Sequence, residues 1–199
     1  MAKAGWAAAS AASLLFLLNL SALGAFAYSR YAESRLDKLP DDSAAAAAAT
    51  AATLAPWSAR YAALNGWILV DGGAVDEAAQ RYERALSWSP ADSLLWTEYA
   101  QALARGDVFD ERLTLATRRA LALAPASPAV RTAVSQMGLS YWRHGQPEVK
   151  DLWRQSMRWE LDHNRASFLA KLDEYEYRIS FCLYHAKELG EEAWCAGVR

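Results

Sequence analysis

The chain has 199 residues, of which 53% are hydrophobic and nine are tryptophan. This length and apolar content supply one ordinary core and argue against a second large domain. Lys and Arg total 21 against 23 Asp and Glu, for a formal net charge of -2, which gives no electrostatic footprint of a nucleic-acid-binding protein.

The N-terminal segment carries no charged side chain over the 26 residues 4–29. As a helix it would extend roughly 39 Å, more than the roughly 30 Å hydrocarbon core of a bilayer. The sequence therefore predicts a transmembrane helix or signal anchor over residues 1–29, with membrane contact through residues 4–29. A cleavable signal peptide is the alternative, because Lys3 precedes the apolar run and Ala25-Phe26-Ala27 matches a cleavage site.

The orientation of this segment has two interpretations. A count of positive residues sets Lys3 against Arg30, Arg35 and Lys38, which favours a cytoplasmic C-terminal part. That rule weakens when a long domain follows, and a segment so close to Met1 is typical of an export signal. We therefore expect a single-pass protein of a bacterial-type inner membrane with a periplasmic domain.

Residues 30–56 are predicted to form a helical linker with an alanine-rich half-repeat. Pro40 interrupts any helix that continues from the first segment. Asp41, Asp42 or Ser43 can then cap a helix through the alanine tract 44–52, which ends near Leu54. Because alanine is the best helix former, a helix is favoured over a flexible spacer.

A period of about 35 residues follows. Pro90 lies 34 residues after Pro56, and Pro125 lies 35 residues after Pro90. Periods of this size are typical of stacked helix pairs, whose apolar faces are buried only when neighbours stack. Small residues recur at the same period, at Ala85, Ala120 and Ser156.

The first full unit, residues 59–92, shows how each pair is expected to fold. Gly66 and Ala78 are small where two helices would cross, residues 72–73 are glycines that make the turn, and Pro90 ends the second helix. These positions resemble the tetratricopeptide repeat (TPR) family, although Asn65 stands where a large apolar residue is usual. Later units begin near residues 93 and 128, which predicts an all-α, TPR-like solenoid over residues 57–163.

Residues 164–199 are predicted to form a capping helix and tail. Apolar positions at helical spacing run from residue 164 to Gly190, a natural stop, and Glu174 can pair with Arg178. Cys182 and Cys195 lie about equally far from the turn at Gly190. A disulfide is expected in an oxidising compartment, and two unlinked buried thiols are the alternative. The apolar positions are Phe168, Leu172, Tyr175, Ile179, Leu183 and Ala186.

Motifs for catalysis or metal binding are missing from the sequence. There is no CxxC or HExxH arrangement, the three histidines are scattered, and residues 71–77 lack the Lys-Ser/Thr of a phosphate loop. Asp173, Glu174 and Glu176 are adjacent on a charged helical face. We therefore expect no enzyme activity, metal, cofactor or small-molecule substrate.

The resemblance to TPR proteins implies a concave groove lined by the first helix of each pair. Several members of the family hold a terminal carboxylate with a lysine and asparagine set that these positions do not reproduce. The third unit also places Thr132, Ser135 and Leu139 on this face. The residues that we expect to contact a partner are Arg60, Trp67, Glu98, Gln101, Arg105, Gln136, Trp142 and Arg143.

These features favour a non-catalytic, membrane-anchored TPR-like scaffold or accessory subunit. Its expected partner is an integral membrane protein of the cell envelope, and the layout implies assembly of secretion or surface-polysaccharide machinery. The alternative is a chaperone-like factor that holds exported unfolded chains near a translocon. One stable stoichiometric partner would support the first hypothesis, and weak binding to many unfolded peptides the second.

Overall fold

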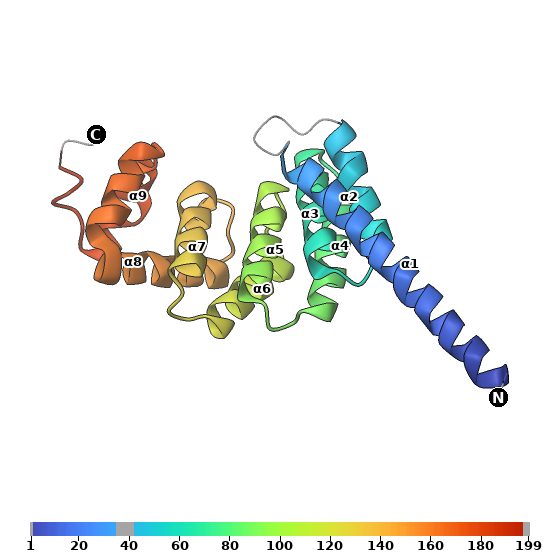
Figure 1. Cartoon of the computed structure of the whole chain (residues 1–199). Helices are drawn as coiled ribbons and strands as arrows, with labels where there is room; N and C mark the ends of the chain where they lie inside the picture. Colours follow the sequence, from blue (N-terminus) through green and yellow to red (C-terminus); the bar gives the residue numbers. More distant parts are fainter. Residues whose placement is uncertain (1, 35–41, 197–199) are drawn as a thin grey trace. The chain divides into compact units, whose positions relative to one another are not determined.

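The computed structural model describes residues 2–34 and 42–196 (Figure 1). These residues form α-helices and no strand, which confirms the predicted all-α class. The chain divides into two compact units, Met1–Pro90 (unit 1) and Ala91–Arg199 (unit 2). Each unit is described by itself below.

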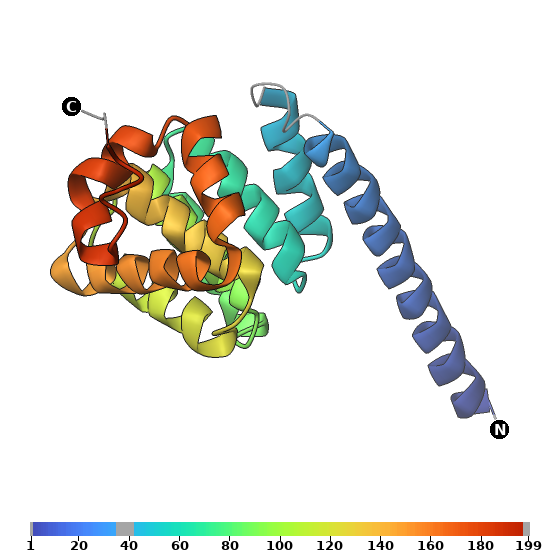
Figure 2. The ribbon, with the colours of Figure 1, turned by 90° about the vertical axis from the view of Figure 1, so that its left-hand side faces the viewer.

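Unit 1 contains four helices, α1 (Ala2–Glu33), α2 (Asp42–Leu54), α3 (Ala59–Asp71) and α4 (Val75–Trp88). Each helix packs on the next one along the chain. In both views α1 extends well past the other helices of this unit (Figures 1 and 2). The predicted break at Pro40 and the cap at Asp41 lie outside the described residues.

The predicted transmembrane helix over residues 1–29, with membrane contact through residues 4–29, is wrong. Within residues 2–34 and 42–196, no helix combines the length and the apolar character that crossing a membrane requires. The segment is long and free of charge, but freedom from charge is not the same as apolarity. Alanine and serine fill much of it and Asn19 interrupts its leucines, and these side chains gain little or lose on transfer to hydrocarbon.

The C-terminal half of α1 instead packs on the alanine tract. Ala25, Ser29 and Ala32 on α1 are buried, as are Ala44, Ala47, Ala48 and Ala51 on α2. Small side chains on both helices let the two backbones approach closely. The alanine tract is therefore an ordered helix of unit 1, as the propensity of alanine predicted.

Unit 2 begins with two helix hairpins, α5 (Ser93–Arg105) with α6 (Glu111–Leu123) and α7 (Pro128–Tyr141) with α8 (Pro147–Glu174). The side chains of Asp92, Asp110 and Ser127 cap α5, α6 and α7 by accepting hydrogen bonds from backbone N-H groups. α5 also packs on α7, and α6 on α8. Unit 2 is thus a stack of two helix pairs.

The recurring small residues confirm the register of the helix pairs. Ala85, Ala120 and Ser156 have no exposed surface at all. Gly66 faces Tyr82, where an added Cβ would lie 2.9 Å from the ring, and Gly138 faces Trp153, where it would lie 2.7 Å from the Cβ. A side chain at either glycine would force the helices apart, so the fold is helical and repeat-like.

The tail is not the single helix that was predicted over residues 164–190. α8 consists of two helical segments joined by a kink at Asn164, whose φ of -137° is not helical, and the second segment ends at Glu174. Glu176 has a φ of 60°, which turns the chain into α9 (Arg178–Tyr184) and α10 (Ala186–Leu189). Gly190, with a φ of 77°, ends α10 as expected.

Because of this break, only some of the predicted apolar positions of the tail are buried. Phe168, Leu172 and Ala186 are buried, but Tyr175, Ile179 and Leu183 are exposed. Arg178 pairs with Asp173 at 3.4 Å instead of with Glu174. Residues at helical spacing share one face only while the helix continues. Here the helix ends at Glu174, so the residues after it no longer share the face of Phe168 and Leu172.

Candidate functional site

The two predicted contact residues of unit 1 lie on α3 and have different surroundings. Arg60 is exposed, and its Nη2 lies 2.7 Å from a carboxylate oxygen of Glu33 on α1. Burial raises the pKa of Glu33, but the hydrogen bonds and charges of Arg60 and Arg30 outweigh it and hold that pKa below its ordinary value. Trp67 is half-buried. Arg60 therefore helps to hold α1 against α3.

The predicted face of α5 is the most open part of the expected groove within unit 2. Glu98 and Arg105 are exposed and Gln101 is half-buried. Leu94, one turn before Glu98, is also exposed. This face therefore presents charged, amide and apolar side chains at helical spacing.

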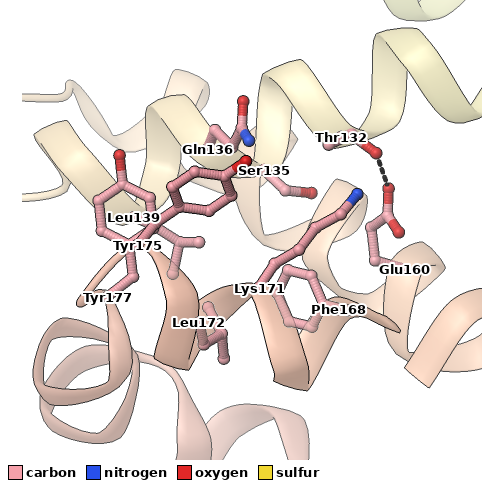
Figure 3. Close-up of a pocket in the computed structure, with 10 residues that line it drawn as sticks. All are labelled: Thr132, Ser135, Gln136, Leu139, Glu160, Phe168, Lys171, Leu172, Tyr175 and Tyr177. Carbon is pink, nitrogen blue, oxygen red and sulfur yellow. Dashed lines mark hydrogen bonds between the residues drawn. The ribbon is translucent and has the colours of Figure 1, made fainter. Parts of the chain in front are cut away.

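The predicted face of α7 lines a hollow in unit 2. Thr132, Ser135, Gln136 and Leu139 form one wall (Figure 3). Thr132 donates a hydrogen bond of 2.6 Å to Glu160, and Lys171 extends across the opening on the side of this pair (Figure 3). The hollow has a volume of about 10 Å³, which is about enough for one water molecule.

The opposite wall comes from the end of α8 and the turn after it. Phe168 and Leu172 are buried there, and Tyr175 and Tyr177 close the side of the hollow (Figure 3). The chain thus covers this part of the α7 face with its own residues. Gln136 lies in an intramolecular contact and is only half-exposed.

Trp142, at the C-terminal end of α7, packs within unit 2. Its ring centroid lies 4.3 Å from that of His185 and 6.4 Å from that of Trp153. The guanidinium of Arg154 and the amino group of Lys150 lie 5.2 Å and 5.5 Å from the same ring. Cation-ring contacts of this kind stabilise the fold. These neighbours, all in unit 2, leave Trp142 only half-exposed.

Arg143 is exposed to solvent, but its side chain contacts Tyr184 within unit 2. Its Nε donates a hydrogen bond of 2.6 Å to the hydroxyl of Tyr184, and its guanidinium lies 5.5 Å from that ring. The residue therefore links the end of α7 to α9. The structure brings Trp142 and Arg143 together with the tail, and neither of them with the α5 residues Glu98 and Gln101.

His185 is a titratable group of unit 2 that the sequence did not single out. It is fully buried, and within residues 2–34 and 42–196 its two ring nitrogens have no hydrogen-bond partner. Burial, with a smaller contribution from the charge of Arg154, lowers the pKa of His185 to about 4. The neutral ring fits a cage of aromatic side chains that includes Trp142, Phe181 and Tyr184.

This pKa predicts acid sensitivity. An unfolded histidine has a pKa of about 6.5, so between pH 6.5 and 4 the unfolded chain binds more protons and stability falls as the pH is lowered. Between pH 7 and pH 5 the contribution of His185 to the free energy of unfolding should drop by about 2 kcal/mol. His185→Phe should remove that part of the pH dependence in urea unfolding, whereas His163→Phe, at an exposed position, should not. Parallel pH profiles for wild type and His185→Phe would contradict the assignment.

The two cysteines meet as expected from their positions around Gly190. The structure brings Cys182, on α9, and Cys195 to disulfide distance, with their Cα atoms 5.6 Å apart. Arg165 also pairs with Glu191 beside this hairpin. The tail is thus held to α8 and to itself by separate contacts.

A second hollow, in unit 1, was not anticipated. It lies between α2, the turn that follows it, α3 and α4, and has a volume of about 260 Å³. Arg81, Arg84 and Trp88 of α4 border it on one side and Asn65 of α3 reaches it from the core. The one sequence signal was Asn65, a polar residue at a position where the repeat pattern has a large apolar one.

Among residues 2–34 and 42–196, no three His, Cys, Asp or Glu side chains form a cluster that could hold a metal ion. Function is therefore argued from the exposed surfaces of the helices and from the two hollows. No protein-family model and no curated protein matches this chain.

Proposed function

We propose that the chain is a non-catalytic helical-repeat scaffold or accessory subunit, of the TPR-like kind, that binds another protein of the cell envelope. The observation that carries the proposal is the apolar surface of α1. Leu17, Leu23 and Phe26 are 61%, 66% and 57% exposed, and Leu20 lies between them. Exposed apolar surface of this kind marks an interaction site.

The energetics favour a protein partner on this surface. Burial of one leucine or phenylalanine side chain contributes about 1.5–3 kcal/mol. Several such side chains on one helix can therefore supply a substantial part of a binding energy. The face of α5 with Glu98 and Gln101 remains the proposed second contact, because it carries the polar groups that give selectivity.

An oxidising location such as the periplasm belongs to the same proposal. Two cysteines at disulfide distance are typical of proteins in oxidising compartments. The wider setting that we propose is assembly of an envelope complex.

The test places a photo-crosslinking benzoylphenylalanine at Leu23 of the full chain in cells. We expect one discrete adduct of defined mass, and none from the same group at the exposed Arg119 of α6. Many adducts of different mass would favour the alternative, a chaperone-like factor that holds unfolded chains. Adducts only to lipid or to a second copy of the chain would contradict the proposal.

Charged substitutions on the same surface give a prediction. Leu23→Glu together with Phe26→Glu, in a chain without the crosslinking group, should lower co-purification of the partner that the crosslink identifies at least about ten-fold, because each side chain is worth more than the 1.4 kcal/mol that equals a factor of ten. Thermal melting should stay unchanged, because both side chains are exposed. Arg119→Glu is the matched control. Unchanged recovery with the double variant would exclude α1 as the contact.

A further inference from the structure

The hollow of unit 1 contains a polar side chain that is buried without a partner. Asn65 is 5% exposed and lines the hollow. Its side-chain amide makes no hydrogen bond to any residue of the described ranges, in contrast to Ser58, whose side chain accepts from the N-H of Tyr61. The residue is buried, but its amide atoms are not among the fully enclosed polar atoms that lack a partner. The amide therefore reaches the open space of the hollow, where it can bind an external partner.

Two arginines reach the same hollow from α4. Arg81 and Arg84 are three residues apart and therefore share one face of the helix. Neither has a carboxylate within ion-pair distance among the described residues, and no Asp or Glu of those residues lines the hollow. Two neighbouring guanidinium groups repel each other, and a carboxylate between them would relieve this repulsion through forked hydrogen bonds.

An aromatic ring lies beside the arginines. Trp88, at the end of α4, is 40% exposed, and the guanidinium of Arg84 lies 5.2 Å from its ring centroid. This contact holds Arg84 at the rim of the hollow. It also leaves indole surface for an apolar group next to the anion.

The remaining wall mixes apolar and hydroxyl side chains. Ala52, Pro56 and Ala62 give it apolar surface that suits aliphatic groups. The two hydroxyls in the lining are already engaged, because Thr53 donates to the carbonyl of Ala49 and Ser58 accepts from the N-H of Tyr61. An asparagine amide presents one acceptor and two donors, which match the N-H and C=O of a peptide bond. The lining thus combines a site for backbone, a site for a carboxylate and an apolar surface.

We propose that this hollow binds an extended segment of a partner protein through a carboxylate, with Arg81 and Arg84 on the carboxylate and Asn65 on the neighbouring peptide bond. The proposal rests on the proposed function and gives the chemistry of the segment that this unit recognises. A volume of about 260 Å³ is near the lower end of ligand pockets, which suits one or two residues of a chain.

The probes are three fluorescein-labelled octapeptide mixtures in which the flanking positions are Ala, Pro, Leu, Ser and Phe. The first has a central Glu and an amidated C-terminus, the second a central Gln and an amidated C-terminus, and the third a central Gln and a free C-terminus. Fluorescence anisotropy with the full chain should show binding of the first or third mixture at least about ten-fold tighter than the second. Comparison of the first mixture with the third shows whether the site prefers the carboxylate of an acidic side chain or that of a chain terminus. Equal binding of all three mixtures, or no binding, overturns the proposal.

Variants of the full chain locate the site. Arg81→Gln with Arg84→Gln should lose at least about ten-fold of the affinity for the carboxylate mixture, and Arg119→Gln, on the exposed side of α6, should lose none. Asn65→Leu should weaken binding with little change in thermal stability, because the amide makes no hydrogen bond within the described residues that the substitution would break. Unchanged affinity in the arginine double variant overturns the site.

A uronic-acid disaccharide serves as the competitor that separates peptide from acidic polysaccharide. Displacement of the peptide by the disaccharide at a lower concentration than by unlabelled peptide overturns the peptide assignment. The crosslink from Leu23 reports independently on the proposed function. If the crosslink forms and no carboxylate mixture binds, the proposed scaffold function is supported and the carboxylate site is contradicted. If a carboxylate mixture binds and no discrete crosslink forms, the carboxylate site is supported and the proposed scaffold function is contradicted.

Discussion

Replacement of Trp153 by alanine is expected to lower the free energy of unfolding of unit 2 by about 3–5 kcal/mol. Trp153 is fully buried on α8 and packs against Gly138, Gly145 and the ring of Trp142. The glycines have no side chain that could move into the space left behind. The cavity would therefore remain, and its cost adds to the lost burial of the ring.

Urea unfolding followed by circular dichroism measures this effect. Trp153→Phe should cost clearly less than Trp153→Ala, because most of the ring volume stays and the indole N-H has no hydrogen-bond partner among the described residues. Leu115→Ala, at an exposed position of α6 in the same unit, should change stability by no more than about 0.5 kcal/mol. A loss below about 1 kcal/mol for Trp153→Ala would show that α7 and α8 do not pack as described.

Loss of the link between Cys182 and Cys195 is the second large effect, at about 3 kcal/mol of stability in unit 2. The two residues are 13 positions apart, and closure of a loop of about this length removes that much entropy from the unfolded chain. The effect should be confined to the tail and the helices that it covers. Reduction should lower the melting temperature of the wild type.

The matched variant is Cys182→Ser with Cys195→Ser, which should melt at the temperature of the reduced wild type and be insensitive to the reductant. Peptide mapping without reduction should show the two cysteines in one linked fragment. Free thiols at both positions in protein trapped with an alkylating agent would contradict the link. They would also remove the support for an oxidising compartment.

Features that depend on neighbouring residues were predictable from the sequence. The spacing of Ala85, Ala120 and Ser156 placed the buried crossings of successive pairs, because a helical period is a local property that repeats with the unit. Gly190 as a helix stop follows from its freedom to adopt a positive φ, and the meeting of Cys182 and Cys195 follows from that turn. These features need only a helical period that repeats along the chain and the geometry of one turn.

Features that depend on long-range packing were decided by the tertiary structure. The sequence showed that residues 4–29 are uncharged, but it did not show that Ala25 and Ser29 pack on the alanine tract. It placed Gln136 and Trp142 on a groove face and set a boundary between residues 163 and 164. It did not show that the chain after the kink at Asn164 lies against that face, because this depends on long-range packing.

Asn65 is a residue whose proposed role became visible only in the tertiary structure. As one letter it was a departure from the repeat pattern, and only its place beside Arg81 and Arg84 gives that departure a chemical meaning. The sequence by itself determined the helix pairs of the repeat, α3 with α4, α5 with α6 and α7 with α8, because they follow from local periodicity. The tertiary structure decided which faces stay open, because exposure of a side chain depends on every element that packs around it.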